Sequence, residues 1–515
     1  YQGAYHVATR APFGNDHNLA YRYNNGVPNQ LTQDLRPYRT YSRVRYNAFY
    51  AQDQFTRGRM TVAGALRYDH SWSYYPEQQI GPTRFLPEPL VFPKTPGEIG
   101  YDHIPPRAGV SYDLSGKGKT AVKFNAGKYL EAAVNGNGNY SQLLPSSRIA
   151  TTTTRTWTDA NGNFTADCNL LSGAAQDLRA GGGDFCGPWG NQSFGQNVYS
   201  LSYDEQILEG WGVRPSDWQI GVTLQQEILP RIGVEIGYLR RWLQNFTVTD
   251  NRAVSASEFD EFSITAPLDP RLPDGGGYTI NGLYNVRPDR FGLTDDFRTY
   301  APNFGEISQV YNGVDLSVNA RLTNGLQMRL GTSTGQRVTD YCDVRSKLPE
   351  QTGGFSTGSE VPGYSPTNPY CRYAPGVTTR LTAAGSYTVP KIDVLVSSTF
   401  QSTPGEPLAA DWNVANAIAQ PSLGRPLPAA GGSVVVNLLA PGAMNFDRVN
   451  QLDFRVGKIL RFGTHRANLA LDLFNALNAD TVLGYNQTFV PGGNWLVPTS
   501  VLTARTAKVT VQYDF

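Results

Sequence analysis

The chain has 515 residues, of which 44 are basic and 43 acidic, so its formal net charge is only +1. This balance gives no electrostatic reason for a nucleic-acid partner, and none is expected. Mean hydropathy is -0.38 and no apolar run reaches the ~18 residues of a membrane-spanning helix, while 12% aromatic residues and 53 glycines favour β-structure with many turns.

Apolar and polar residues alternate along several segments of the chain. The clearest are RMTVAGALRYDH, DWQIGVTLQQEI, RIGVEIGYLRRW, NGVDLSVNARL, NQLDFRVGKIL, RANLALDLFN and KVTVQYDF. In the second, Val222 and Leu224 share one face and Thr223 lies on the other. Segments of this length match the ~9–11 residues of a strand that crosses a bilayer at a tilt, whereas the mean strand of a soluble protein has ~5–6. The pattern predicts strands with lipid on one face and water on the other.

Short and long connections alternate between these segments. Short turns are predicted at 56–59, 115–118, 229–231, 323–325, 389–391 and 461–464. Long polar stretches cover 71–106, 130–216, 244–306, 339–376, 403–447 and 479–503. Membrane barrels have such short periplasmic turns and long extracellular loops. Strand 44–55 would then run toward the periplasm, strand 59–70 away from it, and strand 504–515 toward it again.

The predicted fold is all-β, a transmembrane antiparallel up-and-down β-barrel over residues 44–515 with long extracellular loops. Six hairpins and a last strand, with one more strand before residue 44, would make about 14 strands. Residues 1–43 are predicted as an irregular segment or an extra strand and loop. Aromatic girdles at the two interfaces are expected from residues near strand ends, namely Tyr68, Tyr112, Tyr129, Tyr238, Trp242, Tyr387 and Tyr513.

The four cysteines form two local pairs in predicted outer loops, without the close spacing of a zinc site. We expect the disulfides Cys168–Cys186 and Cys342–Cys371, with free thiols as the alternative. Closing a loop of ~18 residues in this way is worth about 3 kcal/mol in the chain-entropy model.

No catalytic or metal-binding motif stands out in the chain. Asp159, Asn161, Asn163 and Asp167 are spaced nearly as in an EF-hand, but the glycine comes one place early and the distal glutamate is missing, so a solvated turn is expected rather than a calcium site. The chain has five histidines and neither a G-x-S-x-G nor an H-E-x-x-H motif. We expect no enzymatic activity, no cofactor and no metal.

The order of several motifs resembles one family. YNAFYAQDQF, GRMTVAGALRYDH, PPRAGVSYDLSGKGKTAVKFNAGKYLE and NQLDFRVGKILRFGTHRANLALDLFNALN are similar to the barrel of TonB-dependent outer-membrane receptors, in particular the Oar-like group, whose members carry a carboxypeptidase-regulatory-like domain at the N-terminus. The resemblance runs from about residue 20 to 515. It implies a barrel of about 22 strands around a plug. The chain would then be the C-terminal two-thirds of such a barrel, with the plug, the TonB-contacting segment and the first strands absent.

The resemblance also implies partners and a function. The final VTVQYDF resembles the aromatic C-terminal signal read by the barrel-assembly machinery, carried here by Val509, Val511, Tyr513 and Phe515. The implied protein lies in the bacterial outer membrane, in contact with its lipid. It binds a scarce ligand (a siderophore, an oligosaccharide or a peptide) with its outer loops and imports it when the TonB complex acts on the plug.

Charged and polar residues are expected on the inner face of the strands. They are Arg67, Asp69, Lys123, Gln225, Glu227, Glu235, Arg321, Arg329, Asp453, Arg455 and Asp472. We expect them to hydrate the wall or hydrogen-bond a plug, and the alternative is a substrate path.

Two other protein classes remain open from the sequence. A passive porin or a surface adhesin would share the barrel without an energised step. A soluble β-propeller or sandwich is less favoured, because a propeller needs a repeat of ~40–50 residues and none is present.

Overall fold

The computed structural model describes residues 2–10, 18–132, 144, 148–198, 201–323, 325–350, 365–428, 432–463 and 465–514. Among them no helix has the length and apolar character needed to span a membrane. Phe515 of the expected assembly signal lies outside the described residues, as do Asn324 and Thr464 of two predicted turns.

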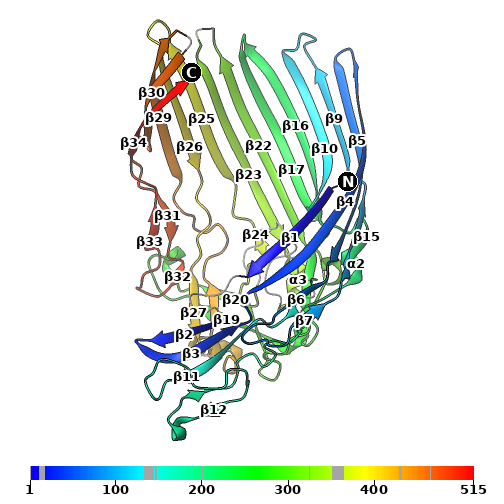
Figure 1. The fold of residues 1–515 in the computed structure, drawn as a ribbon. Coiled ribbons are helices and arrows are strands. Elements are labelled where there is room, and N and C mark those ends of the chain that lie inside the picture. The colour runs from blue at the N-terminus through cyan, green and yellow to red at the C-terminus, as the bar shows by residue number, and fades with distance from the viewer. Residues whose placement is uncertain are drawn as a thin grey trace.

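A sheet of 17 strands forms the wall of the molecule, and all of them except β8, β15 and β24 belong to one antiparallel ladder (Figure 1). In ladder order these strands are β1 (Gln2–Arg10), β4 (Tyr38–Arg57), β5 (Met60–Tyr75), β9 (Pro106–Asp113), β10 (Thr120–Leu130), β16 (Ser216–Leu229), β17 (Ile232–Gln244), β22 (Ser308–Arg321), β23 (Gln327–Asp340), β25 (Thr378–Val389), β26 (Val394–Thr403), β29 (Val449–Phe462), β30 (His465–Phe474) and β34 (Thr506–Asp514). Each long strand pairs with the next long strand in the chain. The predicted up-and-down order is therefore confirmed, and β1 supplies the strand expected before residue 44.

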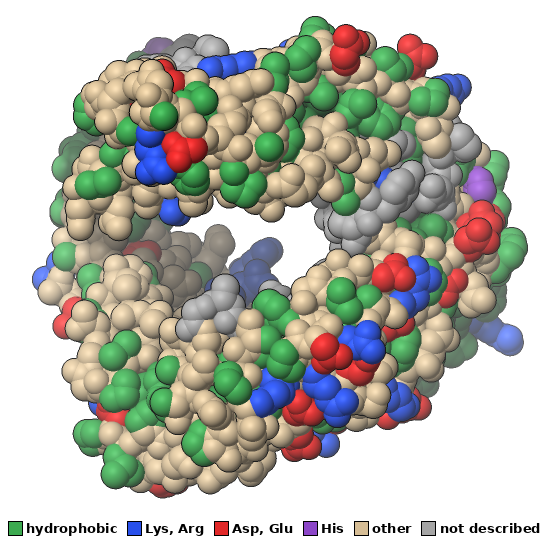
Figure 2. Space-filling view, turned by 90° about the horizontal axis from the view of Figure 1, so that it is seen from below, with side chains coloured by type: hydrophobic (Ala, Val, Ile, Leu, Met, Phe, Trp, Pro, Cys, Tyr) green, Lys and Arg blue, Asp and Glu red, His purple; other side chains and the backbone are tan. Residues whose placement is uncertain are grey.

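The six predicted short turns all lie at one end of this wall, and the long connections lie at the other (Figure 1). The turn between β4 and β5 needs only Gly58 and Arg59, and Gly58 has a φ of 58°. Glycine adopts this left-handed conformation without the steric cost that a β-carbon brings. Among the described residues no pairing joins β34 to β1. Seen from the long-loop end, the molecule surrounds a central opening (Figure 2).

The outer face of the wall carries an apolar belt. The strand register places Val62 beside Val110, Val110 beside Phe124, and Phe124 beside Val222. The same belt continues through Leu316 to Leu471, which pairs with Val456 and Val509. These side chains are exposed rather than packed: 44% of Val222 and 51% of Leu471 is accessible. Exposed aliphatic side chains in continuous register are what a lipid-facing surface requires.

One predicted girdle residue is wrong. Tyr129 pairs with Asp217 and therefore lies on the inner face, whereas Tyr112, Tyr238, Trp242 and Tyr513 share the face of the belt. The Arg107 guanidinium lies 4.6 Å from the centre of the Tyr129 ring. The cation–π contact with Arg107 and the polar side chains of the inner face stabilise the Tyr129 ring on this side of the wall.

The long connections contain short strands and helices. The strands are β2 (Leu19–Asn24), β3 (Val27–Asp34), β6 (Gln78–Ile80), β7 (Leu90–Phe92), β8 (Thr95–His103), β11 (Thr152–Thr158), β12 (Gln176–Asp177), β13 (Phe185–Cys186), β14 (Ser202–Tyr203), β15 (Glu209–Trp211), β18 (Thr247–Asn251), β19 (Phe259–Thr265), β20 (Thr279–Val286), β21 (Asp296–Tyr300), β24 (Arg372–Tyr373), β27 (Asp411–Ala415), β28 (Ser433–Asn437), β31 (Val482–Tyr485), β32 (Thr488–Phe489) and β33 (Pro498–Val501). The helices are α2 (Glu205–Leu208), α3 (Cys342–Lys347) and α4 (Asn416–Leu423), with 3-10 turns at Arg179–Gly181, Ala256–Glu258, Pro273–Gly275 and Ala301–Asn303. Apart from β8, β15 and β24, which belong to the sheet of the wall, these strands form small sheets of their own, such as the five-stranded sheet of β2, β3, β11, β12 and β13.

The belt predicts a strong difference between neighbouring positions on one strand. Leu316 lies on the outer face of β22, and Ser317 lies on the inner face beside Glu235. Leu316→Arg should destabilise the barrel by ~2–4 kcal/mol if the position is near the bilayer midplane, because the charge enters hydrocarbon. Ser317→Arg should cost far less, because its guanidinium meets water and a carboxylate. Folding into lipid vesicles, followed by denaturant titration, measures both, and equal costs would contradict the membrane assignment.

Candidate functional site

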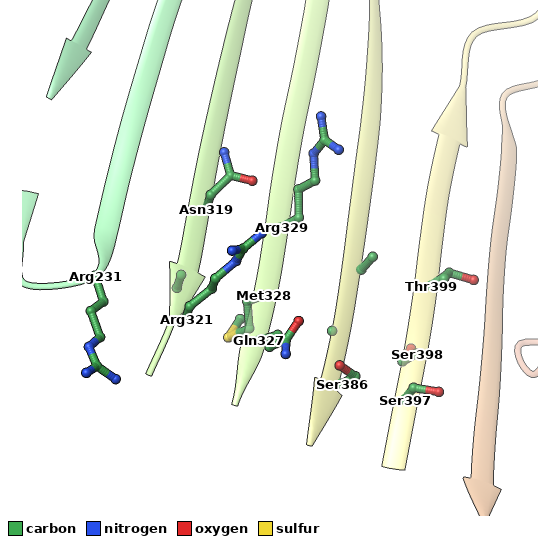
Figure 3. Close-up of a pocket in the computed structure, with 13 residues that line it drawn as sticks. Arg231, Asn319, Arg321, Gln327, Met328, Arg329, Ser386, Ser397, Ser398 and Thr399 are labelled. Carbon is green, nitrogen blue, oxygen red and sulfur yellow. The ribbon is translucent and has the colours of Figure 1, made fainter. Parts of the chain in front are cut away.

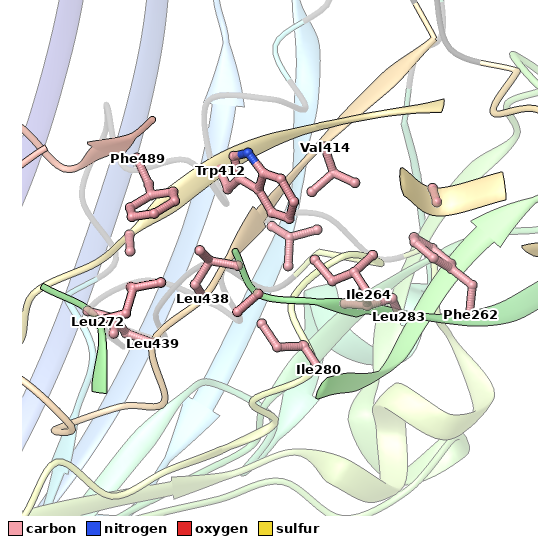
Figure 4. Close-up of a cluster of buried hydrophobic side chains, with 14 of the residues drawn as sticks. Phe262, Ile264, Leu272, Ile280, Leu283, Trp412, Val414, Leu438, Leu439 and Phe489 are labelled. Atoms are coloured by element: carbon pink, nitrogen blue, oxygen red, sulfur yellow. The ribbon is translucent and has the colours of Figure 1, made fainter. Parts of the chain in front are cut away.

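Among the described residues, the largest buried apolar cluster lies in the long connections rather than inside the wall. We call it the loop core; its buried members are Phe262, Ile264, Ala266, Leu272, Ile280, Leu283, Leu408, Ala410, Trp412, Val414, Ala419, Leu423, Leu427, Val436, Leu438, Leu439, Phe489 and Trp495. They come from three connections, β17–β22, β26–β29 and β30–β34 (Figure 4). Burial of this much apolar surface stabilises one joint arrangement of the three segments.

Polar side chains fasten the same three connections to one another. The Arg271 guanidinium pairs with Asp269 at 2.7 Å and donates to the carbonyl oxygens of Gly493 and Trp495 at 2.9 Å. The hydrogen bonds from Arg271 hold the pKa of Asp269 below its ordinary value. Arg425 pairs with Asp260 at 2.8 Å and donates to the carbonyl of Asn285 at 3.0 Å. Each arginine therefore joins two connections that are far apart in the sequence.

A second loop core lies under the first connections of the chain. Its buried members are Leu19, Leu31, Leu35, Ile80, Phe85, Phe92, Ile149, Trp157, Cys168, Leu170, Cys186 and Phe194. Trp157 is 1% exposed, and its indole N–H donates to Asp184 at 2.9 Å. The predicted disulfide Cys168–Cys186 is present inside this core, with a Cα–Cα distance of 6.4 Å. A buried tryptophan and a covalent link together fix a segment that otherwise has little regular structure.

The other predicted disulfide is present too. Cys342 begins α3 and is bonded to Cys371, 29 residues later, next to β24. It closes most of the connection between β23 and β25. Both predicted pairs are thus confirmed, and both lie at the long-loop end.

Six of the eleven predicted inner-face residues form contacts with one another along the wall. Arg67 pairs with Asp69 at 2.8 Å, and Arg455 pairs with Asp472 at 2.6 Å. Gln225 donates to the carboxylate of Glu235. The strand register puts all of them on the face opposite the apolar belt. These pairs explain how polar side chains coat the wall.

The remaining inner-face residues are placed differently. Glu227 accepts the backbone N–H of Arg231, and Asp453 accepts from Gln451 and from the backbone of Asn475. Arg321 and Arg329 line a hollow of the wall. Lys123 lies on the inner face, beside Thr223. A role of these residues in a substrate path stays a prediction.

His70 lies on the outer face of β5, in register with the belt. Its Nδ1 lies 2.9 Å from Asp102 Oδ1, and the Tyr68 hydroxyl donates to the same oxygen at 2.6 Å. The Trp72 ring stacks on His70 at a centroid distance of 5.0 Å. Asp102 lies 32 residues from His70 in the chain, and no local sequence signal marked it as the partner.

The segment 158–167 folds as a turn held by its own backbone. Asp159 accepts the backbone N–H groups of Gly162, Asn163 and Phe164. Within the described part of the chain, no group of three or more His, Cys, Asp or Glu side chains is arranged to hold a metal ion.

The long-loop rim carries interspersed acidic and basic side chains around the central opening (Figure 2). A family model for the outer membrane beta barrel domain matches residues 8–433, well over half of the chain. The chain belongs to this outer membrane β-barrel family. It therefore lies in the bacterial outer membrane.

Comparison with solved structures finds several outer-membrane proteins that are similar to this chain, at low sequence identity and with TM-scores below 0.5. The outer membrane transporter YddB from Escherichia coli aligns with a TM-score of 0.44 and 10% identity, over 92% of this chain and 54% of its own. The closed form of the ferric-catecholate import receptor Fiu from E. coli K12 aligns with a TM-score of 0.40 and 12% identity, over 96% and 53%. The ferric citrate transporter FecA aligns with a TM-score of 0.39 and 9% identity, over 96% and 53%. The chain spans about half the length of these three proteins, and no curated protein sequence matches it significantly.

The loop core of this β-barrel should be separable from its wall. Leu283 is fully buried, and Leu268 in the same connection is 83% exposed. Leu283→Ala should destabilise the loop core by ~2–5 kcal/mol through lost burial and a cavity. Leu268→Ala should change stability by at most about 0.5 kcal/mol. Limited proteolysis should then cut the connections of the first variant faster while the wall stays intact; equal cleavage of both variants would contradict the packing.

A buried carboxyl makes one contact between the connections pH-dependent. Glu350 accepts the backbone N–H of Asn251 at 3.4 Å. Burial, together with the nearby carboxylates of Asp250 and Asp296, raises the pKa of Glu350 to about 7. The folded state therefore binds this proton more tightly than the unfolded chain, so the stabilisation is present below about pH 4.5 and is lost as the pH rises through about 7.

Glu350→Gln should remove this dependence, because glutamine mimics the protonated acid. Hydrogen exchange in β18 should be slower in the variant than in the wild type at about pH 8 and similar in both at about pH 5. Glu306→Gln, an exposed position near the end of the preceding connection, is the control and should leave exchange unchanged at both values. Faster exchange in Glu350→Gln than in the wild type at about pH 8 would contradict the predicted direction of the pH dependence.

Proposed function

We propose that the chain is the barrel of a TonB-dependent outer-membrane receptor of the Oar-like group. In this proposal the extracellular loops bind a scarce ligand, which enters the lumen when energy is coupled through a plug. The residues that carry the proposal are those of the loop core, because three connections far apart in the sequence pack into one structure at one rim of the wall. A binding site assembled from several connections needs such joint packing, because its residues must be held in fixed positions.

Charge and shape at the rim are compatible with this role. Arg271 and Arg425 hold the connections in fixed positions. The outward side chains of these connections are therefore held on a fixed backbone. Binding sites on loops gain affinity when the loops are ordered beforehand, since less conformational entropy is lost on binding. The energy-dependent import step is proposed from the sequence resemblance to TonB-dependent receptors.

The second candidate is a passive porin. The central opening in Figure 2 favours it, because an open passage of this kind conducts small solutes. The two functions differ in their dependence on energy, and the ligand classes that remain open are a siderophore, an oligosaccharide and a peptide.

Uptake in cells with and without TonB separates the two functions. The protein, expressed from its own gene in the outer membrane, should import one of three fluorescent probes: a ferric siderophore, a maltodextrin or an oligopeptide. Import should be saturable and should fall to background without TonB or after the proton gradient is dissipated. Equal, non-saturable entry of all three probes in both strains would establish the passive pore instead.

A further inference from the structure

Three arginines gather on the wall near the short-turn end, and we call them the arginine sector: Arg231, Arg321 and Arg329 (Figure 3). Arg231 lies in the turn between β16 and β17, Arg321 ends β22, and Arg329 follows near the start of β23. The backbone N–H of Arg321 donates to the carbonyl of Arg231 at 3.1 Å, which fixes these two residues side by side. In Figure 3 the Arg321 side chain extends from β22 toward Arg329.

The arginine sector borders a hollow of about 840 Å³. This volume is in the range of small-molecule sites. The register carries the same face onward from Arg329 to Ala384 and Thr399, and from Gln327 to Ser386 and Ser397. Three hydroxyl groups therefore lie on the inner face beyond the guanidinium groups. All three arginines are exposed within the described part of the chain.

Within the described part of the chain, none of these three guanidinium groups has a carboxylate partner. Other inner-face arginines of the same wall do: Arg67 with Asp69 and Arg455 with Asp472. Several acidic residues of the inner face have other contacts. Glu227 accepts a backbone N–H, Glu235 accepts from Gln225, and Asp453 accepts from Gln451.

Neighbouring like charges on one face of a sheet repel each other. The wall could relieve this repulsion with carboxylates, as it does at Arg67 and Arg455, but at this sector it does not. A bound anion would supply the missing charge. Guanidinium forks bind carboxylate and phosphate oxygens in pairs, and hydroxyl groups donate to the oxygens that remain.

We propose that the arginine sector binds a small polyanionic solute, one with at least two phosphate or carboxylate groups, on the inner wall near the short-turn end. Arg231 lies in a turn at the rim, whereas Arg329 lies within a strand. A solute that contacts both residues therefore needs more than one anionic group. The inference rests on the proposed transport function in one respect, namely that the solute passes through the lumen. It restricts that solute to multiply charged anions.

The probes are inorganic pyrophosphate, which carries phosphate groups, and citrate, which carries carboxylate groups. Isothermal titration calorimetry on the purified chain in a non-ionic detergent should show binding of both. The double variant Arg321→Gln/Arg329→Gln should bind at least about tenfold more weakly, because two charge-assisted contacts are lost. Lys508→Gln is the matched control: it removes one positive charge from the same inner face, beside Asp472, and should bind as the wild type does.

Arg321→Lys/Arg329→Lys keeps the charge but loses the paired donors, so its affinity should lie between those of the wild type and the Gln variant. Each variant is first shown to fold by its heat-dependent gel migration, and the Lys variant serves if the Gln variant does not fold. Absence of binding by the wild type at about 1 mM probe, or an equal loss in Lys508→Gln, overturns the site. Loss of TonB-dependent import with pyrophosphate binding intact would count against the proposed function alone.

Discussion

The main-chain hydrogen bond in a medium without water is the constraint on which this structure depends. In hydrocarbon, each unpaired N–H or C=O costs several kcal/mol, so a segment that crosses must pair along its whole length. The long strands meet this demand by pairing with the next long strand in the chain, from β1 to β34. Pairing fixes register, and register fixes which side chains meet lipid. The belt from Val62 to Val509 is therefore a product of the backbone ladder as much as of the side chains themselves.

A wall with a wet interior cannot stabilise the segments above it by a central core. Its inner face offers ion pairs such as Arg455 with Asp472, which balance charge but provide no apolar core. The connections must therefore supply their own apolar interior, which they do in the loop core and the second loop core. The two disulfides act in the same direction, because they reduce the conformational freedom of connections that have few regular strands.

The wall could be predicted from the sequence because its signals are local. Alternation in DWQIGVTLQQEI and the short turn after it are visible within a few residues, and strand and turn followed at those positions. The loop core could not be predicted, because its contacts join distant segments: the Ser263 backbone N–H bonds the Ser422 hydroxyl, and Arg425 reaches Asn285. Tyr129 was assigned to the wrong face because the assignment rested on its aromatic side chain near a strand end, whereas the alternation of side chains along β10 places it on the inner face. The arginine sector contains two residues expected on the inner face, but its lack of carboxylate partners is visible only in three dimensions.

The joint packing of three connections bears on how the outer surface can change during evolution. Residues that share one interior are energetically coupled, so the effect of a substitution in one connection depends on the residues in the other two. Trp495, for example, donates to the carbonyl of Ala409 and packs beside Phe489. A replacement there would alter which substitutions are tolerated near β27. Outer segments that diversify under pressure from phage or host would therefore have to vary as a set, and insertions would be tolerated best at exposed positions such as Leu268, outside the shared interior.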